Sequence, residues 1–303
     1  MIRTPDWKDL ETQRNLQIIA EKEMIDATTM LEMMREREAN PLQEINTPWH
    51  QHDDGVFGFV IGGLHLLGGY SGHGKTTAAV QILLQSMIDG NRVSMASMEM
   101  EPSQVMGILI RMAAANHNPS PAYADKLAAK MDPLFNYWNV IDAQDPDAVL
   151  QWVYASAETK KAKLIVLDNL MMVGDVTGEA KEEKEFCAAL STIAKQFQCA
   201  IICCHHFRKP GATGENIPGG KESFIGSSMM INICASVTVM HKDIEIAEAK
   251  SSGLPVEPTM AEYSFGVVKN RYGEYHGRIP LWTHQSRLFS SRMSKRVQAA
   301  WSV

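Results

Sequence analysis

The residues with the clearest chemistry form one run of the 303-residue sequence, Gly69-Tyr70-Ser71-Gly72-His73-Gly74-Lys75-Thr76. The run fits the pattern G-x-x-x-x-G-K-[ST] of a phosphate-binding loop. Its glycines let successive backbone N–H groups turn inward around an anion, while Lys75 reaches the outer phosphates and the Thr76 hydroxyl binds Mg²⁺. We therefore predict a nucleotide site formed by Gly69, Ser71, Gly72, His73, Gly74, Lys75, Thr76 and Thr77.

The residues on either side of this run support that interpretation. Leu64 to Gly68 is typical of a short buried strand, and Thr77 to Asp89 carries apolar residues at helical spacing until Gly90. A strand, a glycine-rich loop and a helix in that order place a helix N-terminus beneath a triphosphate. This context argues against a chance glycine-rich turn.

Two carboxylates outside the loop are candidates for metal binding and catalysis. Asp168 follows four aliphatic residues, Leu164 to Leu167, in the form of a Walker B strand whose aspartate holds Mg²⁺. Glu99 ends the strand after the loop's helix, so we expect it at the same edge of the sheet, where it could orient the attacking water. Glu101 is the competing candidate. Glu99 is preferred because it lies nearer to the end of the strand.

Four basic residues could also act on a phosphate. His205 and His206 end another strand at that edge, and one of them could sense the γ-phosphate; a packed, hydrogen-bonded histidine is the alternative. Lys269 and Arg271 alternate with Asn270, so both can point the same way from a strand end. Such a pair could neutralise charge at the phosphates of a neighbouring subunit, but a solvated surface pair explains the pattern equally well.

Composition limits the class of protein. The apolar fraction of 45% allows a sizeable core, and the net charge of −6 means that any nucleic-acid contact must come from a local patch. The five cysteines suggest reduced, buried thiols, because Cys203, Cys204 and the histidines after them alternate between strand faces and cannot converge on one metal ion. No apolar stretch reaches the length of a membrane span and the N-terminus does not resemble a signal peptide, which predicts a cytoplasmic protein.

Strand and helix patterns alternate along most of the chain. Strands are expected over 64–68, 92–97, 137–141, 164–168 and 199–204, and helices over 77–89, 102–116, 147–160 and 179–197. This alternation predicts an α/β fold with a mainly parallel sheet and helices on both faces. Further along we expect a glycine-rich loop over 208–224, a strand over 235–240, a polar insertion over 242–260, an antiparallel pair over 263–268 and 277–282, and a basic tail over 290–303 that frays.

The N-terminal part carries a separate helical pattern. Residues 7–39 contain no glycine or proline, and one narrow apolar stripe runs along them, formed by Leu16, Ala20, Met24, Ala27, Leu31 and Met34. A helix with so narrow an apolar face is not stable alone in water. It must pack either on its own core or on a neighbouring subunit, and the pattern favours neither.

These motifs together resemble the RecA-fold motor domain of the DnaB-type hexameric replicative helicases, phage members included, over about residues 47–289. Ser97-Met98-Glu99-Met100 is similar to the family's Ser-Leu-Glu-Met element, whose Glu is the catalytic base, and Asp168 falls on the Walker B position. His206 matches the phage-type His that reads the γ-phosphate. Lys269-Asn270-Arg271 resembles the family's Lys-Asn-Arg, whose Lys and Arg reach the neighbour's ATP.

The resemblance implies a RecA-like P-loop NTPase fold with an N-terminal linker helix over 1–45, an ATPase domain over 46–290 and a tail over 291–303. It implies ATP and Mg²⁺ as ligands, with Thr76 and Asp168 at the metal. The catalytic residues are then Lys75, Glu99, His206, Lys269 and Arg271. Gly226-Ser227-Ser228 resembles the family's DNA-facing Gly-Ser-Gly element, and the expected DNA contacts are Arg208, Lys209, Lys221, Gly226 and Ser227.

The function implied is an ATP-driven DNA helicase of phage-like replication. It would form a homo-oligomeric ring, most simply a hexamer, that moves 5′ to 3′ on single-stranded DNA and works with a separate primase or loader. A RecA- or RadA-like recombinase and a ring ATPase without unwinding activity are the alternatives. Three features depart from the family pattern: His73 in the phosphate loop, Ile225 where many members have arginine, and a longer insertion over 242–260.

Overall fold

The computed structural model describes residues 25–49, 57–139, 145–174, 180–208, 214, 216–226, 228–291 and 301–303. The chain divides into two compact units, residues 1–43 and residues 44–303. In the first unit, helix α2 (Ala27–Ala39) begins after Asp26, whose carboxylate accepts a hydrogen bond from the Thr29 N–H at 2.8 Å. Residues 7–24 of the helix predicted over 7–39 lie outside the described residues.

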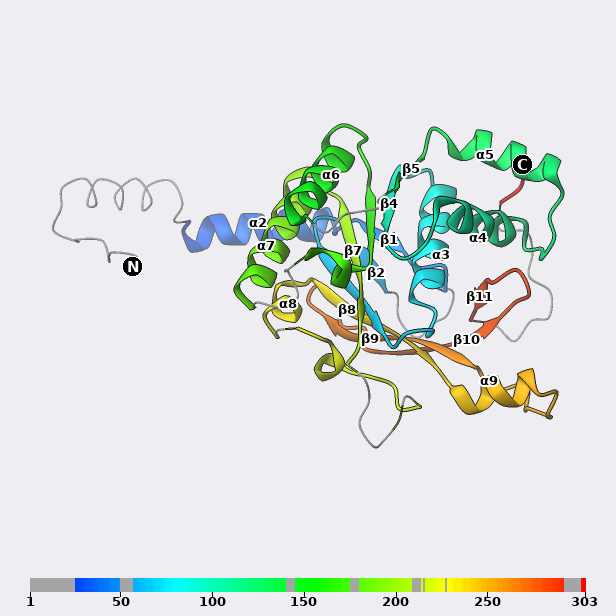
Figure 1. Ribbon diagram of the computed structural model, residues 1–303. Coiled ribbons are helices and arrows are strands. Elements are labelled where there is room, and N and C mark those ends of the chain that lie inside the picture. The colour runs from blue at the N-terminus through cyan, green and yellow to red at the C-terminus, as the bar shows by residue number, and fades with distance from the viewer. Residues whose placement is uncertain are drawn as a thin grey trace. The chain divides into compact units, whose positions relative to one another are not determined.

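The second unit is built on a sheet that has nine strands within the described residues, in the order β11-β10-β9-β8-β3-β7-β6-β4-β5 (Figure 1). The strands are β3 (Leu64–Gly69), β4 (Val93–Ser97), β5 (Phe135–Asn139), β6 (Leu164–Asp168), β7 (Ala200–His206), β8 (Ser236–Lys242), β9 (Tyr263–Asn270), β10 (Gly277–Thr283) and β11 (Phe289–Ser290). The six from β8 to β5 in the sheet order are parallel, and β9, β10 and β11 add an antiparallel edge. The predicted α/β fold and the predicted antiparallel pair are confirmed.

Helices cover both faces of this sheet. On one side lie α3 (Lys75–Ile88), α4 (Pro102–Ala114) and α5 (Pro121–Met131), and on the other α6 (Pro146–Glu158), α7 (Ala180–Phe197) and α8 (Ser228–Ile233) (Figure 1). Strand β6 shows why its sequence is a continuous aliphatic run. Leu164 and Val166 pack in the core beneath α3 and α4, while Ile165 and Leu167 pack in the core beneath α6 and α7.

Parallel strands matter for the site because their carboxyl ends meet at one edge. Ser97 at the end of β4 lies opposite Asp168 at the end of β6, and Gly69 at the end of β3 lies opposite His206 at the end of β7. Residues far apart in the sequence are therefore brought to the same edge of the sheet, where the loop before α3 also lies.

Several elements differ from the sequence-based expectation. β5 begins at Phe135 rather than Tyr137, because its register is set by pairing with β4 from Val93 onward. Helix α9 (Ile244–Ser251) lies in the expected polar insertion, and α8 and the small sheet of β1 (Glu44–Asn46) and β2 (Gly58–Val60) were not predicted either. All four elements are short, so local periodicity gives little signal for them.

The end of the chain also departs from the frayed tail that was expected. Trp301 is buried, its N–H donates to the Ala113 carbonyl at 3.1 Å, and its own carbonyl accepts from the Tyr123 hydroxyl at 2.9 Å. The Lys130 ammonium lies 5.0 Å from the centre of the Trp301 ring. Residues 301–303 are thus held on α4 and α5. Among the helices in the described ranges, none is long and apolar enough to cross a bilayer.

Candidate functional site

The predicted phosphate-binding loop joins β3 to α3 at the carboxyl edge of the sheet. Gly74 is the N-cap of α3 and has a φ of +84°, a left-handed conformation that glycine adopts without the strain of a side chain. A Cβ at Gly74 would also come within 2.9 Å of the Phe289 ring. The helix therefore starts directly after the loop, at Lys75 rather than at Thr77 as predicted, and its free N–H groups point into the loop.

A cavity of about 390 Å³ opens beside this helix N-terminus. Its lining includes most of the predicted nucleotide-binding residues together with two predicted catalytic residues: Ser71, Gly72, Gly74, Lys75, Thr76, Thr77, Glu99 and His206. The rest of the wall comes from the antiparallel edge of the sheet, through Tyr263, Thr283, His284, Arg287 and Phe289. The structure thus brings the loop, the end of β4 and the end of β7 together around one cavity.

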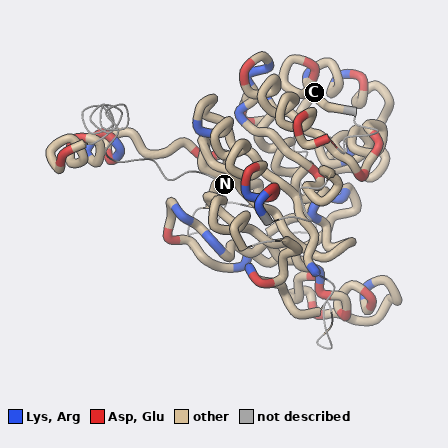
Figure 2. Tube along the Cα trace, turned by 60° about the vertical axis from the view of Figure 1, so that its left-hand side comes forward, with Lys and Arg blue, Asp and Glu red and all other residues tan. Residues whose placement is uncertain are grey.

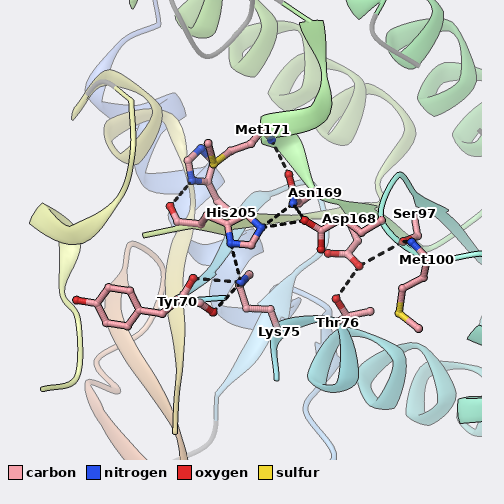
Figure 3. A network of polar contacts seen from close by, with 12 residues as sticks. Tyr70, Lys75, Thr76, Ser97, Met100, Asp168, Asn169, Met171 and His205 are labelled. Atoms are coloured by element: carbon pink, nitrogen blue, oxygen red, sulfur yellow. Dashed lines mark hydrogen bonds and ion pairs between the residues drawn. The ribbon is translucent and has the colours of Figure 1, made fainter. Parts of the chain in front are cut away.

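Lys75 is almost fully buried and uses its ammonium group at the base of this cavity. Nζ donates to the Gly69 carbonyl at 3.1 Å and to the Tyr70 carbonyl at 3.0 Å, and it lies 3.2 Å from Nδ1 of His206 (Figure 3). Burial lowers the pKa of Lys75, and the nearby Asp168 and Glu99 carboxylates partly oppose that effect. Their charge favours the protonated form that a phosphate needs.

His206 links this lysine to Glu99. Because an ammonium group can only donate, Nδ1 of His206 accepts from Lys75, which leaves Nε2–H to donate to Oε1 of Glu99 at 2.9 Å. The Asn169 side-chain amide also donates to Oε1 of Glu99. These bonds, the one from His206 first among them, lower the pKa of Glu99, so its carboxylate is ionised and held in place.

Asp168 lies next to this group and is fully buried. Its Oδ2 accepts from the Thr76 hydroxyl at 2.8 Å and from the Ser97 hydroxyl at 3.4 Å (Figure 3). Burial raises the pKa of Asp168, while the bond from Thr76 lowers it. Among the described residues, Oδ1 of Asp168 has no hydrogen-bond partner. A hydroxyl and a buried carboxylate with one oxygen left over are the donor set that Mg²⁺ binds beside a nucleotide, so these residues fit that ion.

The two competing candidates lie away from the cavity. Glu101 is the N-cap of α4, and its N–H donates to the Gln104 side chain at 3.1 Å. His205 is fully buried, its Nδ1 lies 2.9 Å from the His206 carbonyl, and burial lowers its pKa to about 4. Of each pair, Glu99 and His206 are the members that reach the cavity.

His73, the unusual residue of the phosphate loop, also points away from the cavity. It is buried, and its Nδ1 accepts from the N–H of Lys242 at 3.1 Å. Its ring packs edge-on against Tyr70 and against His241. Burial, followed by nearby positive groups, lowers the pKa of His73 to about 4, which keeps Nδ1 available as an acceptor. His73 therefore ties the loop to the end of β8.

Lys269 and Arg271 lie at the end of β9 and point the same way, as their spacing predicted. Both side chains donate to main-chain carbonyls at the C-terminal end of α8, and both reach the Asn232 carbonyl. Neither lines the cavity of its own subunit.

The predicted DNA contacts are only partly described. Arg208 is exposed, and its guanidinium donates to the Gly226 carbonyl at 3.2 Å. The backbone beside them is joined by a hydrogen bond from the Arg208 N–H to the Ser223 carbonyl at 2.8 Å, and exposed Lys221 begins the short 3-10 helix η3 (Lys221–Ser223). Lys209 and Ser227 lie outside the described residues.

Sequence reasoning missed several residues at the cavity. Asn169 directly follows the Walker B aspartate, and that position at a strand end is a signal that could have identified it. The wall formed by Tyr263, Thr283, His284, Arg287 and Phe289 is more than 160 positions after the loop and has no motif of its own. Its location depends on the order of strands in the sheet, which the sequence pattern did not give.

Comparisons with known proteins agree with this architecture. The family described as "AAA domain" matches residues 34–212, more than half of the chain. A solved structure whose title describes it as an ATPase domain superposes with a TM-score of 0.71 at 12% sequence identity, covering 88% of this chain and 99% of the other. No curated protein matches the sequence. At that identity the structural match establishes the fold, and it confirms the predicted RecA-like P-loop architecture.

Proposed function

The chain belongs to the AAA domain family, and on that premise we propose that it hydrolyses ATP to move along single-stranded DNA, as the replicative helicase of a phage or related element. The observation that carries the proposal is the convergence of Lys75, Glu99 and His206 on the cavity at the end of β3. The phosphate loop supplies the triphosphate site, and the carboxylates beside it supply the groups that hydrolysis needs.

Each residue at the cavity has a distinct chemical task. Lys75 exchanges its carbonyl partners for the outer phosphates, which its positive charge favours. Glu99 is ionised, so its Oε1 accepts the proton of the attacking water. His206 contacts both residues, so it responds when a γ-phosphate takes its place beside Lys75. Thr76 and Asp168 hold Mg²⁺, which neutralises phosphate charge when bound.

A positive charge for the transition state comes from a neighbouring subunit in this proposal. The described lining of the cavity contains Arg287, but it lies on the far wall with Phe289 and Tyr263 rather than beside Lys75 and Glu99. Arg271 is exposed at the end of β9, and we assign it to the phosphates of the next subunit in a ring, most simply a hexamer. The N-terminal helix would dock on the adjacent subunit and support that ring.

The DNA grip in this proposal is light. Arg208, Lys209 and Lys221, with backbone groups at Gly226 and Ser227, would hold backbone phosphates in the channel. Figure 2 shows basic and acidic residues interspersed along the trace, in line with the net charge of −6. Because few cations contribute, affinity for single-stranded DNA should be modest and should fall as salt is raised. We place the protein in the cytoplasm, moving 5′ to 3′ beside a separate primase or loader.

One experiment separates this function from its alternatives. ATP turnover is measured with and without a single-stranded oligonucleotide, and the mass of the assembly is measured in ATP. We expect a ring mass and turnover that rises with DNA. A filament on the DNA would favour a RecA- or RadA-like recombinase, and turnover indifferent to DNA would favour a ring ATPase without unwinding. A single subunit that turns over ATP at full rate with both ligands saturating would exclude shared sites.

A further inference from the structure

The antiparallel edge of the sheet contains an irregularity that changes where Lys269 points. Thr238 on β8 lies opposite Val267 on β9, but the next residue back, Val237, lies opposite Lys269, so Val268 is an extra residue in β9. Residues directly opposite each other in an antiparallel pair share a face of the sheet. Val267 packs in the core on the α3 face and Val237 in the core on the α7 and α8 face. This β-bulge therefore turns Lys269 toward α8.

The Lys269 ammonium is fully engaged there. Nζ donates to the carbonyls of Ile231 at 2.6 Å, Cys234 at 2.8 Å and Asn232 at 3.2 Å. A lysine has three N–H donors, so each of them has an acceptor within its own subunit. These carbonyls lie at the C-terminal end of α8, where helix carbonyls lack intrahelical partners and carry the negative end of the dipole. Lys269 thus caps this helix from a neighbouring strand.

Arg271 makes a lighter contact at the same helix end. In the described part of the chain its side chain donates through Nη2 to the Asn232 carbonyl. An arginine carries five N–H donors, so Arg271 keeps donors for a phosphate. The Lys269 side chain is also partly desolvated, and this burial, with the adjacent Arg271 charge, lowers the pKa of Lys269. The two cations of the Lys-Asn-Arg run are therefore not equivalent.

Helix α8 depends on such an anchor because it is short. It has six residues, too few to be stable alone in water, and it packs into the core through Met230 and Ile231. It starts two residues after Gly226, whose carbonyl accepts from Arg208. Gly226 has a φ of +97°, and a Cβ there would come within 2.6 Å of the Glu183 carboxylate. The position of α8 therefore fixes the end of the segment that the proposed function places on DNA.

We infer that Lys269 is a positioning residue: it anchors the C-terminal end of α8 within its own subunit and so holds the DNA-facing segment, while Arg271 is the cation that reaches the neighbour's phosphate. The resemblance to DnaB-type helicases assigns both residues to the phosphate, and the three carbonyl contacts separate them. The part of this inference that concerns DNA rests on the proposed function.

The anchor is tested without nucleotide or DNA by hydrogen exchange of the full chain. Lys269→Met keeps the apolar stem and removes the three donors, and Lys126→Met on the exposed face of α5 is the matched control. We expect the amides of α8 to exchange at least about tenfold faster in Lys269→Met, because hydrogen bonds from a charged donor to carbonyls are lost, with other regions unchanged. Unchanged exchange in α8 would overturn the inference.

A second measurement tests the consequence for DNA. The concentration of single-stranded oligonucleotide that half-saturates ATP turnover should rise about tenfold in Lys269→Met, more than KM for ATP does, since the lost helix contacts hold the DNA segment. Faster exchange in α8 with an unchanged DNA response would show that Lys269 is only structural and would overturn the positioning role.

Two outcomes are kept separate from these. If Lys269→Met does not fold, Lys269→Gln, which retains amide donors, is measured in the same way, with an intermediate gain in α8 exchange expected and none overturning the inference. If the unaltered protein shows no response to DNA, the proposed function fails, while the exchange result still decides whether Lys269 anchors α8.

Discussion

Two lysines in this molecule have the same number of partners and different roles. Lys75 lies at the end of β3, where its ammonium contacts two carbonyls and His206 at the wall of a cavity. Lys269 lies at the end of β9, where its ammonium contacts three carbonyls of a helix terminus away from that cavity. In both cases burial lowers the pKa of the lysine. The number of hydrogen bonds alone therefore does not reveal which lysine binds a phosphate.

The difference lies in what surrounds the partners. Those of Lys75 belong to a loop before a helix N-terminus, a region that attracts anions, and one of them is a histidine that also contacts Glu99. Those of Lys269 belong to a helix C-terminus, which attracts cations and repels anions. A cation at the first place is arranged for ligand exchange, and a cation at the second is arranged to remain.

The largest expected effect tests the first half of this comparison. Lys75→Ala should reduce ATP turnover below detection, since removal of one preorganised donor to developing charge costs about 100- to 1000-fold and the phosphate site is also weakened. Arg271→Ala should also be inactive, because its charge is missing from the neighbour's site. Mixed rings of the two variants should regain turnover, as some sites combine an intact Lys75 with an intact Arg271. No recovery in a mixture of verified composition would contradict shared sites.

A smaller effect is expected at Glu99, the carboxylate that His206 connects to Lys75. Glu99→Gln should bind ATP and hydrolyse it about 1000-fold more slowly, because the proton acceptor is lost while the shape is kept. The measurement is ATP binding by equilibrium titration beside turnover under the same conditions. Glu101→Gln is the matched control and should change turnover less than about twofold, since an exposed helix-cap residue affects mainly local stability. Equal losses in the two variants would remove the catalytic role of Glu99.

Much of this arrangement could be predicted from local patterns. The loop from Gly69 to Thr76 and the strand ending in Asp168 are continuous segments whose chemistry depends on neighbouring residues, and parallel pairing then brings Glu99 and His206 to the same edge. The α/β alternation followed from helix and strand periodicity in long elements. These are the features for which a local signal and the final packing agree.

The remaining features depend on contacts between distant segments. The bulge that turns Lys269 toward α8 follows from the register between β8 and β9, and no residue of β9 announces it. Asn169 acquires its role only because Glu99 ends the adjacent strand. His73 could be recognised as unusual, but its partner is a backbone N–H of Lys242, 169 positions away, which lies there because β8 neighbours β3.

The smallest effect concerns the strand pair that connects the two lysine regions. His65 on β3 donates from Nε2 to the Val60 carbonyl at 2.9 Å, so its Nδ1 accepts from the hydroxyl of Ser236 on β8 at 2.8 Å. Complete burial lowers the pKa of His65 from 6.5 to about 4. Between these values the unfolded chain binds the proton and the folded chain does not, so the stability contributed by neutral His65 is lost as the pH falls through this window.

The free energy of unfolding should therefore fall by about 2 kcal/mol from about pH 7 to about pH 5 on account of His65 alone, with the other buried histidines adding to the decline. Urea unfolding at the two pH values measures it, with His65→Gln as the comparison, because glutamine can donate and accept without titrating. The decline should be smaller in His65→Gln by that amount. If the two proteins lose the same free energy, His65 does not hold β3 to β8 as a neutral group, and the fixed spacing between the Lys75 and Lys269 regions must come from main-chain pairing instead.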